Sequence, residues 1–266
     1  MAQTALITGA TSGFGAACAR RFVRGGWQVI IVGRRTERLE QLRDELGEAV
    51  TAAISLDVRD RQSVTAALAR LDNVDLLLNN AGLALGLEPA WAVDLDDWET
   101  MVDTNIKGVM YCTRAILPKM VASNRGHIIT IGSTAGNWPY PGGNVYGGTK
   151  AFVQQFSRNL RADLLGTRVR VTNIEPGMAE SEFSNVRFKG DAERAKTVYA
   201  GTDPLRPEDI AEVVFFAATL PPHVNINTLE LMSINQAWGH LAVHRESHPV
   251  PSSGSSASAD DDSRAG

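Results

Sequence analysis

Tyr146 and Lys150 stand four residues apart in a segment whose pattern predicts a helix, so their side chains should share one face. A phenol has a pKa near 10 and is a poor base at neutral pH, but a nearby ammonium lowers that pKa. The pair can then serve as a general acid or base. Ser133 adds a hydroxyl that can position a substrate oxygen for Tyr146. These residues predict proton exchange with an alcohol or carbonyl oxygen.

A glycine-rich segment follows the first strand that we expect and precedes the first helix. Glycines there let the backbone turn tightly and approach a pyrophosphate, whose charge then faces the helix N-terminus. The spacing, Gly-x-x-x-Gly-x-Gly, departs from the tighter Gly-x-Gly-x-x-Gly fingerprint, and a glycine-rich turn without a ligand is the alternative. The residues expected to bind a dinucleotide here are Gly9, Thr11, Ser12, Gly13, Phe14 and Gly15.

The second expected strand ends in Gly33, Arg34 and Arg35. A site for NAD places an acidic residue at this point, where it accepts hydrogen bonds from the ribose 2′-hydroxyl. Two arginines can instead hold a 2′-phosphate with charge-assisted hydrogen bonds, and Arg34 is the better candidate. The segment therefore favours NADP(H), although a solvated basic turn before a charged helix is the alternative.

Apolar strand-like runs alternate with amphipathic helical stretches along the chain. Strands are expected at residues 5–7, 29–32, 53–56, 75–78, 127–131 and 169–174, with a possible edge strand at 228–232. Helices are expected at residues 16–24, 37–46, 61–71, 98–120 and 146–165. Strands that are apolar on both faces and separated by helices imply a parallel sheet covered on both sides. The sequence predicts a single-domain α/β fold of Rossmann type, a doubly wound parallel sheet with helices on both faces.

The composition is that of an ordinary globular protein, with 44% hydrophobic and 21% charged residues among 266. A net charge of −4 leaves no electrostatic footprint for nucleic acid or an acidic membrane. No run approaches the roughly 18 apolar residues of a membrane span, and no secretory leader pattern opens the chain, so we expect a cytoplasmic protein. Cys18 and Cys112 are interpreted as buried free thiols, with one disulfide as the alternative.

The domain organisation follows from where the composition changes. We expect an NADP-binding catalytic domain over residues 1–246 and a flexible polar tail over 247–266, which is rich in Ser, Asp, Gly and Pro. His240, His244 and His248 recur at helical spacing near this boundary. They have no acidic partner pattern, so a solvated or intersubunit role is favoured and no metal site is expected.

The motifs, taken in order, resemble the short-chain dehydrogenase/reductase family over nearly the whole folded length. They are residues 8–15, Asp57-Val58, residues 79–82, Asn105, Ser133, Tyr146-x-x-x-Lys150 and Pro176-Gly177. Within that family, the stretches 132–146 and 182–190 resemble the NADP-dependent 3-hydroxy acid dehydrogenases, also called serine or allo-threonine dehydrogenases.

This resemblance implies an oxidoreductase with Asn105, Ser133, Tyr146 and Lys150 as its catalytic residues. Lys150 would also contact the nicotinamide ribose. Asn105 would anchor a water in a proton relay, and a helix kink near Gly108 is its alternative role.

The resemblance also assigns the rest of the cofactor site. Asp57 would meet the adenine amino group, Val58 would pack against the ring, and Asn80 would lie beside the adenosine ribose, whereas Asn79 is expected to stabilise the sheet. The loop that Pro176 and Gly177 open would cover the nicotinamide. Ser181 stands where the family usually has a threonine for the carboxamide, in a loop one residue shorter than usual.

The substrate would lie under a lid that we place at residues 182–202. Arg187, Lys189, Arg194 and Lys196 give this segment positive charge, and Arg187 can bind a carboxylate bidentately, with a solvated arginine as the alternative. Arg187 would then bind the substrate together with Ser133 and Tyr146, and the resemblance implies that this substrate is a small 3-hydroxy acid. Another small carbonyl compound is the alternative substrate. A dinucleotide sensor without turnover is disfavoured, because a sensor needs no activated phenol. The two long helices resemble the pair that forms homotetramers in the family.

Overall fold

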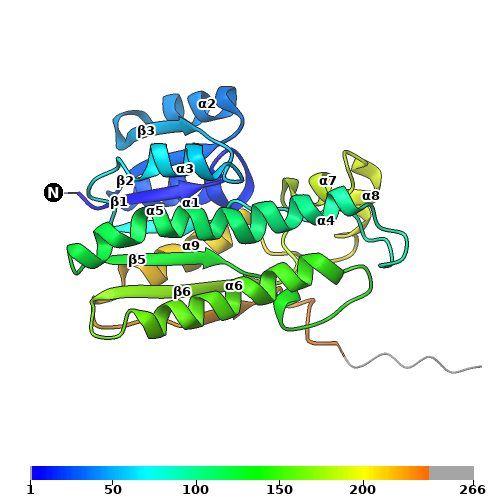
Figure 1. Ribbon diagram of the computed structural model, residues 1–266. Helices are drawn as coiled ribbons and strands as arrows, with labels where there is room; N and C mark the ends of the chain where they lie inside the picture. The colour runs from blue at the N-terminus through cyan, green and yellow to red at the C-terminus, as the bar shows by residue number, and fades with distance from the viewer. Residues whose placement is uncertain (1, 240–266) are drawn as a thin grey trace, which may run out of the picture.

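The structure is a computed structural model, and it describes residues 2–239. Seven parallel strands form one sheet in the order β3-β2-β1-β4-β5-β6-β7 (Figure 1). The strands are β1 (Thr4–Thr8), β2 (Gln28–Gly33), β3 (Val50–Ser55), β4 (Leu76–Asn79), β5 (Gly126–Ile131), β6 (Val169–Pro176) and β7 (Thr228–Leu231). The predicted doubly wound parallel sheet is confirmed, including the edge strand β7.

Helices cover both faces of this sheet. One apolar core packs α1, α2 and α9 against it, and a second core packs α3, α5 and α6 against the opposite face (Figure 1). The helices are α1 (Gly13–Arg24), α2 (Thr36–Leu46), α3 (Arg61–Leu68), α4 (Leu95–Val102), α5 (Gly108–Ala122), α6 (Asn144–Asp163), α7 (Glu182–Arg187), α8 (Ala192–Thr197) and α9 (Pro207–Thr219).

Alternation along the strands divides their side chains between the two cores. In β1, Ala5 and Ile7 belong to the core under α1 and α9, whereas Leu6 belongs to the other core. All five residues of β1 and all four of β4 are buried. This two-sided burial is why the strands read as continuous apolar runs in the sequence.

Two helical expectations need correction. Residues 98–120 do not form one regular helix: α4 begins at Leu95, with the Asp94 carboxylate accepting from the Asp96 N–H, and a π turn at Asp103–Lys107 joins α4 to α5. The helix α9 was not predicted at all. It begins at Pro207, next to an Arg206 N–H that donates to the Asp209 carboxylate at 2.8 Å.

The two cysteines lie in different cores on opposite faces of the sheet, so they form no disulfide. Burial raises the pKa of both thiols, that of Cys112 to about 12. The expectation of buried free thiols is confirmed. Among residues 2–239, no helix combines the length and the apolar character that a membrane crossing needs.

The order of strands reverses between β1 and β4, whose chain connections leave toward opposite sides. In an open parallel sheet such a switch point leaves a crevice at the carboxyl ends of the strands, where ligands bind. The segments that follow β1, β2, β4, β5 and β6 carry most of the predicted site residues. They are therefore expected to converge at this edge.

Candidate active site

Ser133, Tyr146 and Lys150 converge from two elements. Ser133 follows β5 directly, and its Oγ accepts a hydrogen bond from the Ala135 N–H at 3.1 Å, which fixes the first turn after the strand. Tyr146 and Lys150 lie in the first two turns of α6 and are both buried. The Ser133 hydroxyl lies close enough to the Tyr146 phenol to lower its pKa, so the two groups can meet one substrate oxygen.

The pKa of Tyr146 differs from the sequence-based expectation. Burial raises it to about 12, and this outweighs the lowering by the Ser133 hydrogen bond and the Arg187 charge. Lys150 does not produce the expected lowering, because its Nζ donates to the Ile131 carbonyl oxygen at 2.8 Å and lies 5.7 Å from the centre of the Tyr146 ring. Burial also lowers the pKa of Lys150 to about 8. At neutral pH the phenol is protonated and set to donate.

Asn105 lies in the π turn between α4 and α5 and is buried. Its amide group exchanges two hydrogen bonds with the backbone of Leu83, at 2.9 Å to the N–H and 2.8 Å to the carbonyl oxygen, and donates a third to Thr149. A Cβ on Gly82 would lie 3.2 Å from the Asn105 Oδ1 and 3.7 Å from the Lys150 Nζ, so both side chains lie on the same side of Gly82. The two predicted roles of Asn105, in the helix distortion and beside the reactive groups, are compatible.

The glycine-rich segment forms a tight turn between β1 and α1. Gly9 and Gly13 have φ angles of 67° and 50°, which favour glycine. A Cβ on Gly9 would lie 2.9 Å from the Ala81 Cα, and one on Gly15 would overlap the Gly9 carbonyl oxygen. The bare backbone at the N-terminus of α1 fits a pyrophosphate, as predicted from the sequence.

Asn80 supports this turn from the end of β4. Its Nδ2 donates to the Thr8 carbonyl oxygen at 2.8 Å and to the Gly9 carbonyl oxygen at 3.2 Å. The neighbouring Asn79 donates to the Thr113 hydroxyl of α5 at 2.9 Å, which ties the sheet to that helix as expected. The side chain of Asn80 thus holds the glycine-rich turn, residues 9–15, which we call the phosphate loop after its predicted ligand; the sequence did not reveal this structural role.

Arg34 and Arg35 lie exposed between β2 and α2 and differ in their partners. Arg35 donates to the Thr11 hydroxyl from Nε and Nη2, at 3.1 and 3.0 Å, and to the Ser12 hydroxyl at 2.7 Å. It also donates to Glu182 at 2.9 Å. No side-chain hydrogen bond is recorded for Arg34 within the described chain, and its charge helps to lower the pKa of Asp57. Arg35 therefore borders the glycine-rich turn, and Arg34 lies near Asp57.

Asp57 and Val58 follow β3 at the same edge. The Asp57 carboxylate accepts from Arg59 at 2.7 to 3.1 Å. Burial raises the pKa of Asp57, but these hydrogen bonds and the nearby positive charges outweigh it, so the pKa lies below its usual value. Val58 is buried, and a Cβ on Gly108 would lie 2.8 Å from its Cγ2, so Val58 packs against the start of α5. Their predicted contacts with adenine stay predictions.

The loop after β6 begins at Pro176 and Gly177. The Pro176 carbonyl oxygen faces the Ser133 hydroxyl at 3.5 Å, and the Gly177 N–H donates to Leu231 of β7 at 2.8 Å. Ser181 caps α7 by accepting from the Phe183 N–H at 3.2 Å. A Cβ on Gly13 would lie 3.5 Å from the Ser181 Cβ, so Ser181 rests on the phosphate loop.

Arg187 ends α7 beside the reactive phenol. Its guanidinium carbon lies 5.3 Å from the centre of the Tyr146 ring, and one Nη atom donates to the Tyr140 hydroxyl. Its Nε is buried and has no hydrogen-bond partner within the described residues. Phe183 packs against Tyr146 with ring centres 5.6 Å apart. Tyr140, Phe183 and Glu182 were missed by the sequence analysis, although all three lie within the two stretches singled out by the resemblance.

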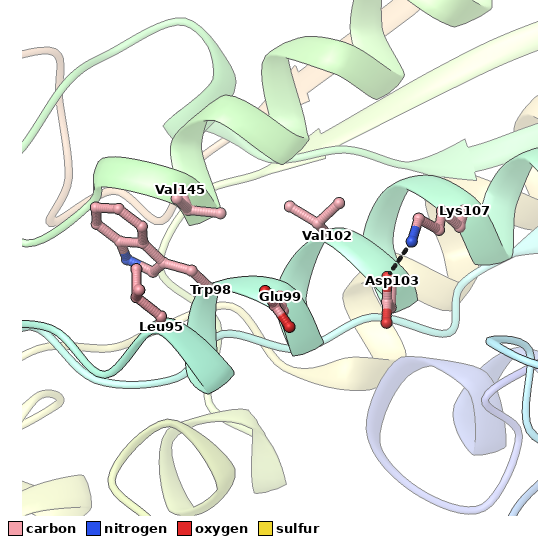
Figure 2. A pocket seen from close by; sticks show the side chains of 7 residues that line it. All are labelled: Leu95, Trp98, Glu99, Val102, Asp103, Lys107 and Val145. Carbon is pink, nitrogen blue, oxygen red and sulfur yellow. Dashed lines mark ion pairs between the residues drawn. The ribbon is translucent and has the colours of Figure 1, made fainter.

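Trp138, which lies between Ser133 and Tyr146 in the sequence, is largely exposed and contacts Trp238 with ring centres 6.2 Å apart. A separate pocket lies on the outer surface of α4, the π turn and the start of α6 (Figure 2). Trp98 and Val145 flank one end of it, and the ion pair between Lys107 and Asp103, 2.7 Å long, closes the other.

Metal binding finds no structural support in the described part of the chain, where no three His, Cys, Asp or Glu side chains gather suitably. His240, His244 and His248, and the whole predicted tail at 247–266, lie outside the described residues.

Comparisons with known proteins agree with this geometry. Residues 3–192 match the model of the family described as short chain dehydrogenase. The NADP-dependent 3-hydroxy acid dehydrogenase of Salmonella typhimurium is 61% identical over 245 residues, which cover 90% of this chain and 98% of that protein. Sulfoacetaldehyde reductase 2 of Chromohalobacter salexigens is 53% identical, with 92% of this chain and all of that protein covered.

A solved structure described as the closed form of serine dehydrogenase complexed with NADP+ superposes with a TM-score of 0.90. It is 58% identical in sequence, and the match covers 92% of this chain and 100% of that one. The sheet order, the Ser133, Tyr146 and Lys150 set and these matches lead to one assignment. The chain belongs to the short-chain dehydrogenase/reductase family.

Proposed function

We propose that the protein is an NADP-dependent oxidoreductase that interconverts a small 3-hydroxy acid, of the serine, allo-threonine or 3-hydroxypropionate type, and its 3-oxo acid or semialdehyde. The observation that carries the substrate class is Arg187, whose buried Nε, beside the Tyr146 ring, has no partner among residues 2–239. A buried donor without an acceptor costs free energy, and a substrate carboxylate would supply the acceptor. The names of the two dehydrogenases matched above support this class.

We assign the cofactor-binding residues from the glycine-rich turn and from the two arginines that follow β2. Arg34 and Arg35 hold the 2′-phosphate, and the bare backbone before α1 receives the pyrophosphate. The full set that we assign to NADP(H) is Gly9, Thr11, Ser12, Gly13, Phe14, Gly15, Arg34, Arg35, Asp57, Val58, Asn80, Tyr146, Lys150, Pro176, Gly177 and Ser181.

A nicotinamide held by Lys150 and the loop after Pro176 would supply or accept the hydride at the substrate carbon. Ser133 donates a hydrogen bond to the substrate oxygen and orients it. Tyr146 gives its phenolic proton to that oxygen during reduction and takes the proton back during oxidation. Lys150 and the Asn105 amide, which lie together beside Gly82, line the path by which a proton returns to Tyr146.

Initial rates test the proposal directly. Purified protein is assayed with NADP+ and NAD+ over L-serine, allo-threonine, 3-hydroxyisobutyrate and 3-hydroxypropionate, and with NADPH over malonic semialdehyde and neutral ketones. We expect turnover of the hydroxy acids and preference for NADP(H). Activity confined to sterols or sugars would contradict the proposed hydroxy acid substrate. A preference for NAD+ would contradict the proposed role of Arg34 and Arg35.

A sulfonate is a second candidate for the anionic substrate, because one relative is named a sulfoacetaldehyde reductase and an arginine can bind either anion. Rates with NADPH on sulfoacetaldehyde and on malonic semialdehyde would distinguish the two classes of anion. A kcat/KM that is higher for the sulfonate would move the assignment to that class.

We also propose that the protein acts in the cytoplasm as a homotetramer. The resemblance of α4, α5 and α6 to the family's tetramer-forming helices supports the assembly, as do exposed apolar side chains on α5, namely Met110 and Val121. The pocket between α4 and α6 lies on the same surface (Figure 2).

A further inference from the structure

The lid segment, residues 182–202, begins with Glu182, whose carboxylate pairs with two arginines near the start of α2. The carboxylate of Glu182, the first residue of α7, accepts from Arg35 Nη1 at 2.9 Å and from Arg38 Nη1 at 2.6 Å. We call these two ion pairs the Glu182 bridge. Burial raises the pKa of Glu182, but the hydrogen bonds and charges of the two arginines outweigh it. The pKa therefore lies below its usual value and the carboxylate stays charged.

The guanidinium of Arg35 connects the bridge to the phosphate loop. Three of its hydrogen bonds go to the hydroxyls of Thr11 and Ser12, and a fourth goes to Glu182. A planar guanidinium has its donors in fixed directions, so binding on one edge sets the direction of the others. The position of Glu182 is therefore set by the segment that we assign to the cofactor phosphates.

The other end of α7 reaches the substrate side. Glu182 and Arg187 are the first and last residues of this six-residue helix, about 7.5 Å apart along its axis. Phe183 and Arg187 both lie over Tyr146, with their distances to its ring centre at 5.6 and 5.3 Å. Because the helix is short and internally hydrogen-bonded, fixing its first residue restricts where its last residue can lie.

The charges at this edge are compatible with a bound phosphate. Arg34, Arg35 and Arg38 carry three positive charges, and Glu182 neutralises one of them. Two remain, close to the charge of about −1.5 to −2 on a phosphate monoester at neutral pH. The bridge and the 2′-phosphate can therefore coexist, with Arg34 free to bind the phosphate directly and Arg35 binding it beside Glu182.

We propose that Glu182 is a positioning residue whose ion pairs with Arg35 and Arg38 hold α7 in place, so that Arg187 stands over Tyr146 to receive the substrate anion. The inference rests on the proposed function, since it takes Arg187 as the group that binds that anion. Glu182 itself touches neither the substrate nor the reacting atoms. Its loss should weaken substrate binding while leaving the affinity for NADPH intact.

The variants that test this are E182Q, R38Q and their double mutant, with E182D as the conservative rescue. We expect E182Q to raise the KM for the hydroxy acid about tenfold, as suits the loss of two partly exposed ion pairs. R38Q should raise it less, and the double mutant should be no worse than E182Q, because both changes break one bridge. E182D should recover part of the loss. The control is E180Q, which removes an exposed carboxylate from the same loop.

Two further measurements keep the outcome decisive. The Kd of NADPH, by fluorescence titration, should stay within about threefold of the parent in E182Q; a loss equal to the loss in substrate KM would make Glu182 part of the cofactor site and overturn the proposal. Amide hydrogen exchange of residues 182–187 in the NADP-bound enzyme should be faster in E182Q and R38Q and unchanged in E180Q. Unchanged exchange in E182Q would also overturn it. Hydrogen exchange needs no turnover, so it tests the Glu182 bridge even if the hydroxy acid assignment is wrong. That assignment is tested separately, by the rates of the parent enzyme.

Discussion

The proton exchange that we propose for Tyr146 depends on one hydroxyl. Replacing Tyr146 with Phe removes it while leaving the ring that packs against Phe183. We expect kcat to fall about 10²- to 10⁴-fold, because a positioned general acid or base contributes that much. Binding of NADPH, followed by fluorescence titration, should persist. Tyr111→Phe, which removes a phenol outside the site on α5, is the control and should keep parental rates. Turnover of Tyr146→Phe within tenfold of the parent would contradict the assigned role.

His127 of β5 is a second residue with a consequence that can be measured. It is buried, its Nε2 lies 2.8 Å from the Thr172 hydroxyl, and its Nδ1 has no partner within the described residues. Burial, aided by the Arg170 charge, lowers its pKa well below the usual value. The unfolded chain then takes up a proton below pH 6.5 that the folded protein excludes. Stability should fall as the pH drops through that value, by about 1 kcal/mol between pH 7 and 5.5.

Urea denaturation at the two pH values measures this loss for the parent and for His127→Gln. The variant should lose about 1 kcal/mol less than the parent on acidification, because it lacks the titrating ring. His223→Gln removes an exposed histidine and should behave as the parent. An equal acid loss in the parent and in His127→Gln would show that other groups control the pH dependence.

At the scale of the elements, Arg170 of β6 caps the C-terminal end of α9. Its guanidinium donates to the carbonyl oxygens of Ala217, Ala218 and Leu220, at 3.2, 2.6 and 3.4 Å, and so supplies donors to the last carbonyl groups of the helix. Replacing Arg170 with Met keeps the length of the side chain and leaves these acceptors unpaired. We expect the free energy of unfolding to fall by about 2 kcal/mol.

The measurement is urea denaturation at neutral pH, with Arg168→Met as the matched control. Arg168 is exposed two residues earlier, on the same strand approach, and its loss should cost under about 0.5 kcal/mol. If both variants are equally stable, the hydrogen bonds of Arg170 do not stabilise the end of α9.

Elements with a clear period were predictable, and those without one were not. The strands β1, β2, β4, β5 and β6 are apolar runs between glycines and charges, and α6 has a distinct polar face. The helix α9 packs between α1 and β6, so most of its faces are apolar and its sequence lacks an amphipathic period. The π turn at Asp103–Lys107 adds one residue to a helical turn, which the apolar pattern does not register.

The chemistry of the site was predictable by residue type, but not the contacts between distant residues. Ser133, Tyr146 and Lys150 are brought together as expected. The pKa of Tyr146 was misjudged, because desolvation depends on which groups cover the phenol. The bond between Arg35 and Glu182 joins residues 147 apart in the sequence, and nothing local to either residue indicates the other.

At the scale of the whole molecule, the sheet gathers the site along one edge and leaves α4, α5 and α6 to face outward. The switch point between β1 and β4 brings the phosphate loop and the end of β4 together, where Asn80 joins them. The lid then closes this edge from residues that follow β6, with Lys189 paired to Asp97 of α4 at 2.8 Å. Glu182 at the start of α7 therefore meets the beginning of α2, and Lys189 just after α7 meets α4, both distant in the chain.

The outward faces of α5 and α6 determine the expected assembly. Met110 and Val121 on α5 are each 41% exposed, Leu165 beyond α6 is 80% exposed, and Phe152 stacks on Phe156. Contact between such faces of two copies would remove apolar area from water. Light scattering after gel filtration should give about 115 kDa for four chains of 28.7 kDa.

Met110→Glu tests which surface forms that contact. A carboxylate on α5 would have to lose its hydration at the interface, so we expect smaller species in place of the tetramer at micromolar concentration. Gln41→Glu adds the same charge to the exposed, polar side of α2 and should keep the parental mass. A parent protein at 28.7 kDa would refute the assembly. A Met110→Glu variant with the parental mass would move the interface to another face, since a buried, unpaired carboxylate at the proposed one could not leave the tetramer intact.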